Sequence, residues 1–198
     1  MAETIELFFV GRCYLDMINF LQINLSKEYF LNEIFCIDNW EWDNLKKIDN
    51  NFAIYNELCH GKIICLDIAS PKCENLGIYI EKYGNNFVYC FWGDTKIFSP
   101  LSLERNLKST RVWYNHLYTY LIDILTLYKL DFKYIAIGIE SKFQYYEDMS
   151  ETINKSKNIS SWIINNKVEL QFDKCLNEYV KRELPIINST LWECFQNE

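Results

Sequence analysis

Alternating apolar and polar residues predict five β-strands in this chain. Successive side chains of a strand point to opposite faces of a sheet, so a half-buried strand alternates in character with a period of two residues. This pattern, or a short run of β-branched and aromatic residues, occurs at residues 4–10, 62–70, 77–83, 87–92 and 134–141. The chain is therefore expected to contain a sheet of about five strands.

The third and fourth of these strands are expected to form a hairpin. They flank the sequence Gly84-Asn85-Asn86, which is typical of a turn. With all three residues in the turn, the two faces of the hairpin would differ in kind. One face would carry Ile78, Ile80, Val88 and Cys90, and the other Tyr79, Tyr83, Phe87, Tyr89 and Phe91. Both faces are apolar enough to be covered by other parts of the protein.

Apolar residues with helical spacing predict helices in the second half of the chain. One helix is expected from about residue 102 to 129, with a polar stripe at Asn115, Thr119, Asp123 and Thr126. Another is predicted from Phe172 and ends before Pro185. Strands and helices that are segregated in this way indicate an α+β fold. We expect one globular domain over residues 1–198, with a largely antiparallel sheet and helices packed against it.

Charge limits the classes of partner. The chain carries a formal net charge of −7, and residues 1–50 contain nine acids against four bases. A negative field repels nucleic-acid phosphates and anionic membranes, and it attracts basic molecules. We therefore expect no nucleic-acid or membrane binding. The expected partner is a basic protein.

The N-terminus and the cysteines indicate a cytoplasmic protein. MAETIELFF begins with acids and lacks the basic start and cleavage pattern of a signal peptide. The most apolar long segment, residues 112–128, is shorter than the ~20 residues that cross a bilayer. Eight cysteines are present, and in a reducing compartment all are expected to be free thiols. Their spacing around Cys59, His60, Cys65 and Cys73 lacks the short pairs typical of zinc sites, so we expect no metal and no cofactor.

Catalytic motifs are sparse. Of the two histidines, His60 precedes a Gly, and His116 lies about 10 Å along the expected helix from Asp123, too far for that carboxylate to orient its ring. No G-x-S-x-G sequence is present. The protein is therefore expected not to be an enzyme. One alternative stays open, because Glu140 and Lys142 form an E-x-K pair at a strand end and resemble the PD-(D/E)xK nucleases. Asp123 or Asp67 would then complete a Mg²⁺ site, although no Pro-Asp pair lies upstream.

The segment IDNWEWDNL, residues 37–45, supplies the candidate binding residues. Asp38 and Glu41 have the spacing of a helix capping box, so a helix is expected to begin here with Trp42 and Leu45 facing the core. Trp40 would then lie on the outer side. It either anchors a partner or packs over the sheet edge or against Phe35. The predicted partner-binding residues are Trp40, Asp43, Glu41 and Asp38.

The aromatic hairpin NLGIYIEKYGNNFVYCFWGD, residues 75–94, and the small, acidic character of the chain resemble the immunity proteins of bacterial contact-dependent toxin systems. This resemblance implies a cytoplasmic inhibitor that binds a cognate protein toxin. It assigns no functional residue, since such proteins have many folds. A Mg²⁺-dependent nuclease and an adaptor or structural domain without catalysis are the two alternatives.

Overall fold

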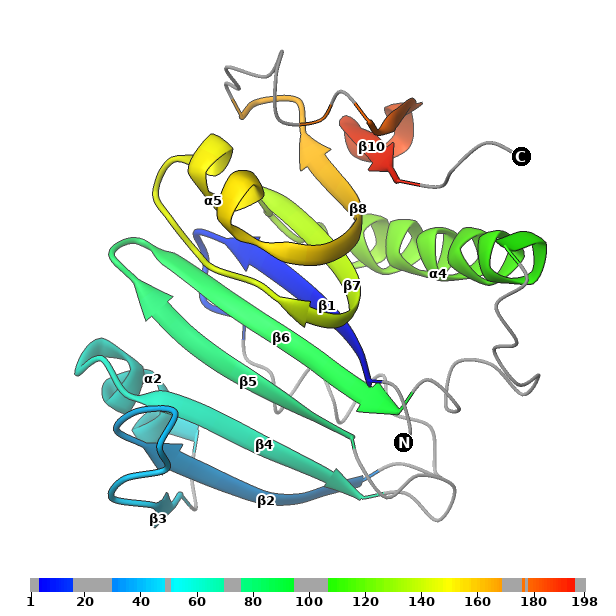
Figure 1. Cartoon of the computed structure of the whole chain (residues 1–198). Coiled ribbons are helices and arrows are strands. Elements are labelled where there is room, and N and C mark those ends of the chain that lie inside the picture. The colour runs from blue at the N-terminus through cyan, green and yellow to red at the C-terminus, as the bar shows by residue number, and fades with distance from the viewer. Residues whose placement is uncertain are drawn as a thin grey trace.

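A computed structural model describes residues 4–15, 30–48, 51–69, 76–94, 107–168, 176 and 178–194 (Figure 1). Ten strands form one open sheet in the order β3-β2-β4-β5-β6-β1-β7-β8-β10-β9, and each neighbouring pair is antiparallel. The strands are β1 (Thr4–Gly11), β2 (Phe30–Ile37), β3 (Lys46–Lys47), β4 (Ile63–Ala69), β5 (Leu76–Tyr83), β6 (Asn86–Asp94), β7 (Tyr134–Lys142), β8 (Lys157–Asn165), β9 (Val180–Leu184) and β10 (Ser189–Glu193). The helices are α2 (Asn51–Cys59), α4 (Leu107–Leu127), α5 (Met149–Lys155) and the short 3₁₀ helix η1 (Pro185–Ile187).

The expected α+β fold with a sheet of about five strands is wrong. The five predicted strands are β4, β5, β6, β1 and β7, which lie side by side in the middle of the sheet. The strands that the sequence pattern missed extend the sheet at both sides. Two of them are mostly polar: β3 is Lys46–Lys47, and in β9, VKREL, four of five residues are exposed. Val180, which we expected in a helix, begins this strand, and Phe172 lies outside the described residues.

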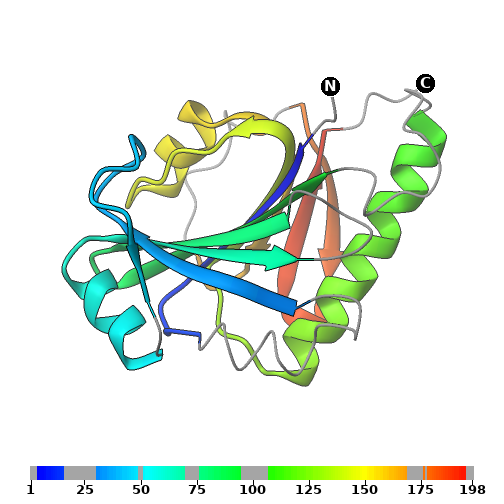
Figure 2. The same ribbon diagram turned by 90° about the horizontal axis from the view of Figure 1, so that it is seen from below.

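The two faces of the sheet have different coverings. Helices α2 and α4 pack on one face, where residues such as Ile54 and Tyr118 join the larger hydrophobic core. Helix α5 lies on the other face (Figure 2). There its Met149 and Ile153 join a second hydrophobic cluster with Trp162. The predicted polar stripe of α4 is confirmed, because Asn115, Thr119, Asp123 and Thr126 are all exposed. No helix among the described residues is long and apolar enough to span a membrane.

The hairpin of β5 and β6 has a tighter turn than its sequence suggests. Tyr83 pairs with Asn86, so only Gly84 and Asn85 form the turn, and Gly84 has a φ of 57°. A shift of one residue in register moves every side chain of one strand to the opposite face. The predicted faces are therefore wrong. Tyr79, Glu81 and Tyr83 share a face with Val88 and Cys90, whereas Phe87, Tyr89 and Phe91 lie with Ile78 and Ile80 on the other.

Candidate functional site

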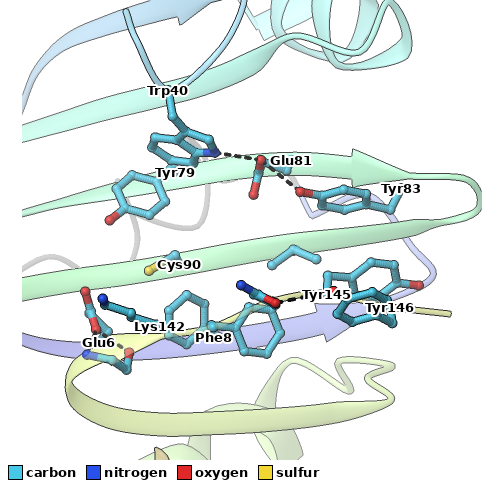
Figure 3. Close-up of a pocket in the computed structure, with 14 residues that line it drawn as sticks. Glu6, Phe8, Trp40, Tyr79, Glu81, Tyr83, Cys90, Lys142, Tyr145 and Tyr146 are labelled. Carbon is cyan, nitrogen blue, oxygen red and sulfur yellow. Dashed lines mark hydrogen bonds between the residues drawn. The ribbon is translucent and has the colours of Figure 1, made fainter. Parts of the chain in front are cut away.

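A groove of about 560 Å³ lies on the face of the sheet that α2 and α4 leave open (Figure 3). Strands β5, β6 and β1 form its floor, because the alternation of each strand brings every second side chain to this face. Trp40, from the loop between β2 and β3, forms one wall, and residues 141–146 form the other. Half of the lining residues are aromatic. Its charged side chains are Glu6, Glu81 and Lys142.

Two aromatic pairs flank Glu81 on the floor of the groove. The Trp40 and Tyr79 rings meet edge to face, with centroids 4.8 Å apart and an interplanar angle of 76°. The Tyr83 and Tyr145 rings are stacked, with centroids 4.8 Å apart. Tyr79, Glu81 and Tyr83 occupy alternate positions of β5, so their side chains emerge on one face. Glu81 is therefore a carboxylate between two pairs of rings.

The Glu81 carboxylate is held by two donors on one oxygen. Its Oε1 accepts hydrogen bonds from the Trp40 indole Nε1, at 3.2 Å, and from the Tyr83 hydroxyl, at 3.0 Å. Its Oε2 accepts none from the residues that the structure describes. Burial raises the pKa of Glu81, although both hydrogen bonds act to lower it. Two hydrogen bonds thus fix the carboxylate in position, while burial disfavours its charged form.

Glu6 lies in a different part of the groove. Its Oε2 accepts hydrogen bonds from the backbone N–H of Ser141, at 2.7 Å, and from the Ser141 hydroxyl. Burial raises the pKa of Glu6. Glu6 is on β1, two strands from β5. The β1 residue in line with Glu81 is Val10, four residues from Glu6, so the Cα atoms of Glu6 and Glu81 are about 16 Å apart. The carboxylates therefore act at separate places and not as an acid–base pair.

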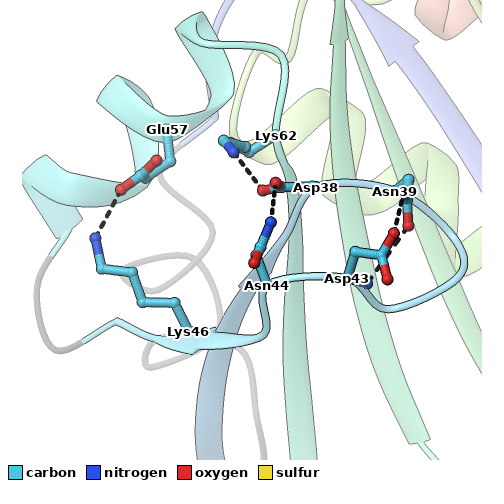
Figure 4. Close-up of polar contacts among 7 residues, drawn as sticks. All are labelled: Asp38, Asn39, Asp43, Asn44, Lys46, Glu57 and Lys62. Atoms are coloured by element: carbon cyan, nitrogen blue, oxygen red, sulfur yellow. Dashed lines mark hydrogen bonds and ion pairs between the residues drawn. The ribbon is translucent and has the colours of Figure 1, made fainter.

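Loop 38–45, the connection between β2 and β3, positions Trp40 by hydrogen bonds from its own side chains (Figure 4). Asn39 Oδ1 accepts from the backbone N–H groups of Glu41, at 3.0 Å, and Asp43, at 3.4 Å. Asn39 Nδ2 donates to the Asp43 carboxylate at 2.9 Å. Such Asx contacts offer the backbone an alternative to a helix. They form a closed turn that carries Trp40 at its tip.

Ion pairs at the base of loop 38–45 hold it against α2 and the start of β4. Asp38 pairs with Lys62 and accepts a hydrogen bond from Asn44 Nδ2 at 2.7 Å. Lys46 pairs with Glu57 of α2 at 2.9 Å. The hydrogen bond from Lys62 lowers the pKa of Asp38. Asp38 is therefore a structural residue of the loop, and its charge is matched within the protein.

The predicted helix at residue 38 is wrong, since α2 begins at Asn51. Trp42 and Asn44 have positive φ values of 65° and 53°, which interrupt any helix. Trp42 and Leu45 are exposed and do not face the core. The capping-box spacing of Asp38 and Glu41 was misleading because the Asn39 side chain makes the local contacts instead.

The structure separates the four predicted partner-binding residues. Trp40 lies at the groove, is 46% exposed, and packs against Tyr79 instead of Phe35. Glu41 and Asp43 are exposed on the loop beside it, and Asp38 is at the base. Sequence reasoning missed Glu81. The available signal was a carboxylate between two tyrosines at alternate positions of a predicted strand.

The carboxylates that a Mg²⁺-dependent nuclease site would need, Glu140, Asp67 and Asp123, do not lie close together. Glu140 Oε1 accepts a hydrogen bond from the backbone N–H of Thr4 at 2.8 Å. Asp67 lies on β4, four strands from β7, which is about 19 Å. Asp123 is exposed on α4, which packs on the face of the sheet opposite the groove. Among the described residues, no three His, Cys, Asp or Glu side chains are grouped so that they could hold a metal ion.

The cysteines of the described ranges are free thiols, and these are Cys13, Cys36, Cys59, Cys65, Cys90 and Cys194. Cys73 and Cys175 lie outside those ranges, as does the side chain of His116. Cys90 lines the groove, where burial raises the pKa of its thiol. It is therefore a protonated, apolar part of the floor and not a thiolate nucleophile.

Comparison of the chain with protein-family models, with curated proteins and with solved structures gave no match.

Proposed function

We propose that this protein binds a basic partner protein through loop 38–45 and the adjoining groove. The observation that carries this proposal is Trp40, a half-exposed ring held between Tyr79 and Glu81 at the edge of the groove. Partly exposed, pre-positioned aromatic residues are the side chains that contribute most to protein–protein affinity. Because hydrogen bonds and ring contacts already fix Trp40, little conformational entropy is lost when a partner covers it.

The surroundings of Trp40 favour a basic partner. Glu41 and Asp43 are exposed beside it, and Glu81 lies below it. By contrast, the lysines near the base of loop 38–45 pair with carboxylates of this protein, as Lys46 does with Glu57 and Lys62 with Asp38. The charge left for a partner is therefore mainly negative. Complementary charge accelerates association and disfavours acidic partners.

The biological role we propose is that of a cytoplasmic immunity protein, which neutralises a toxin by binding it directly. The chemistry of the groove supports binding rather than catalysis. Glu6 and Glu81 are too far apart to act together, and the Cys90 thiol is protonated. No histidine is among the residues that line the groove.

Affinity capture tests this function. The tagged protein and its Trp40→Ala variant are purified from the cells that naturally produce the protein, and the retained proteins are identified. We expect a basic protein to be retained by the first and lost from the second, and its toxic activity to be blocked by the unchanged protein.

Ile186→Ala is the matched control, because Ile186 is a large exposed apolar residue in η1, outside the groove. This variant should retain the same partner. Identical retained proteins for all three versions, or a retained protein whose activity is unaffected, would contradict the proposal.

A further inference from the structure

We propose that the space in front of Glu81, between Trp40 and Tyr145, binds the ammonium group of a lysine side chain from the partner. This inference rests on the proposed function and names the chemical group that the groove recognises. The site is defined by Glu81 and the two ring pairs, Trp40–Tyr79 and Tyr83–Tyr145 (Figure 3).

The charge of Glu81 and its aromatic walls are suited to a cation. Trp40 turns its N–H edge to Glu81, and Tyr83 and Tyr145 stack on each other, so the rings bound the site and the carboxylate supplies the attraction. The Glu81 carboxylate lies among these rings, and its Oε2 accepts no hydrogen bond from the described residues. A cation here would compensate a carboxylate that has been removed from much of its water.

The hydrogen bonds of Glu81 favour lysine over arginine. A guanidinium group binds a carboxylate best as a fork, with one N–H on each oxygen. Oε1 of Glu81 already accepts two hydrogen bonds, from Trp40 Nε1 and from the Tyr83 hydroxyl. Only Oε2 remains to accept another. An ammonium group is a compact charge that can place one of its three N–H donors on Oε2 alone, so it does not need both oxygens as the guanidinium fork does.

Lys142 distinguishes the two carboxylates of the groove. It lines the groove at the end where Glu6 lies, away from Glu81 (Figure 3). No salt bridge joins a base to Glu81 among the described residues. An incoming cation is thus expected at Glu81.

Titration with small peptides tests this inference without the partner. The probes are acetyl-Gly-Lys-Gly-amide and the same peptide with arginine or with norleucine, an uncharged residue of similar length. Binding is followed by NMR through the Trp40 indole N–H and the backbone amides of β5. We expect the lysine peptide to bind at least fivefold more tightly than the arginine peptide, and the norleucine peptide not to shift these signals.

Glu81→Gln is the decisive variant, because a glutamine oxygen can still accept from Trp40 and Tyr83 while the charge is lost. It should weaken binding of the lysine peptide at least tenfold. Asp123→Asn, which removes an exposed carboxylate on α4 outside the groove, should change it less than twofold. If Glu81→Gln were poorly folded, Trp40→Leu would serve, followed through the β5 amides.

Several results would overturn the inference: no shift with the lysine peptide, equal binding of the arginine or norleucine peptide, or equal binding by Glu81→Gln. A partner that was still captured through Trp40 would then leave the proposed function standing.

Discussion

Trp42 has a backbone conformation that bulky residues seldom adopt, with a φ of 65°, and its side chain is 53% exposed. A side chain in this left-handed region costs roughly 1–2 kcal/mol. Strained residues of this kind concentrate at functional positions. Trp42 lies two residues from Trp40 in loop 38–45, so it is a second candidate for contact with the partner.

Replacing Trp42 tests whether its backbone conformation costs stability. Glycine adopts a positive φ freely but loses more entropy on folding, so Trp42→Gly should change the free energy of unfolding by less than about 1 kcal/mol. Trp42→Ala keeps the strain and should be the less stable of the two. Denaturant unfolding measures both. A loss of several kcal/mol in Trp42→Gly would show that the ring is structural.

The carboxylate of Glu81 should make stability depend on pH. Burial raises its pKa above the ordinary value of 4.5, so the folded protein binds this proton more tightly than the unfolded chain does. The resulting stability is fully present below the unfolded pKa and is lost as the pH rises through the higher folded pKa.

Glu81→Gln removes this titration. The melting temperature of the variant, relative to the unchanged protein, should therefore increase between about pH 4 and about pH 7. Ile186→Ala, which removes an exposed side chain without a titrating group, is the control and should show no such trend. A difference for Glu81→Gln that is constant with pH, or that falls, would mean that burial does not dominate at this carboxylate.

At the scale of elements, the strands with strong apolar character could be predicted, and they lie together in the centre of the sheet. The two edge strands, β3 and β9, could not, because they are short and their residues are mostly polar and exposed. Trp40 is 46% exposed, although the helix from which its outward position was predicted does not form. Its contact with Tyr79 and Glu81 could not be predicted, because those residues are 39 and 41 positions away in the chain and meet it only through the sheet.

The turn of the β5–β6 hairpin determines which residues reach the groove. Gly84 has a φ of 57°, whereas Asn85 has no positive φ. Gly84→Ala should lower the free energy of unfolding by about 1 kcal/mol, since alanine is strained there. Asn85→Ala, in the same turn, should change it by less than about 0.5 kcal/mol. Equal losses in the two variants would contradict the two-residue turn and the register that follows from it.

For the whole molecule, the net charge of −7 should act mainly on the rate of association. Asp43 is exposed on loop 38–45, and Asp43→Lys replaces a negative by a positive charge near the proposed contact. This change should slow association with a basic partner. The slowing should become smaller as salt is raised above about 0.1 M, where the screening length is about 10 Å. A salt-independent effect, or an effect on dissociation alone, would indicate a direct contact in place of long-range attraction.

The central claim is that Trp40 and the groove form the partner-binding surface. The most direct test is the dissociation constant of the complex with the captured partner, measured by calorimetry for the unchanged protein and for Trp40→Ala. We expect the variant to bind at least about thirtyfold more weakly, which corresponds to roughly 2 kcal/mol, while it remains folded under the conditions of the assay. An unchanged dissociation constant for folded Trp40→Ala would contradict this account and place the partner elsewhere on the protein.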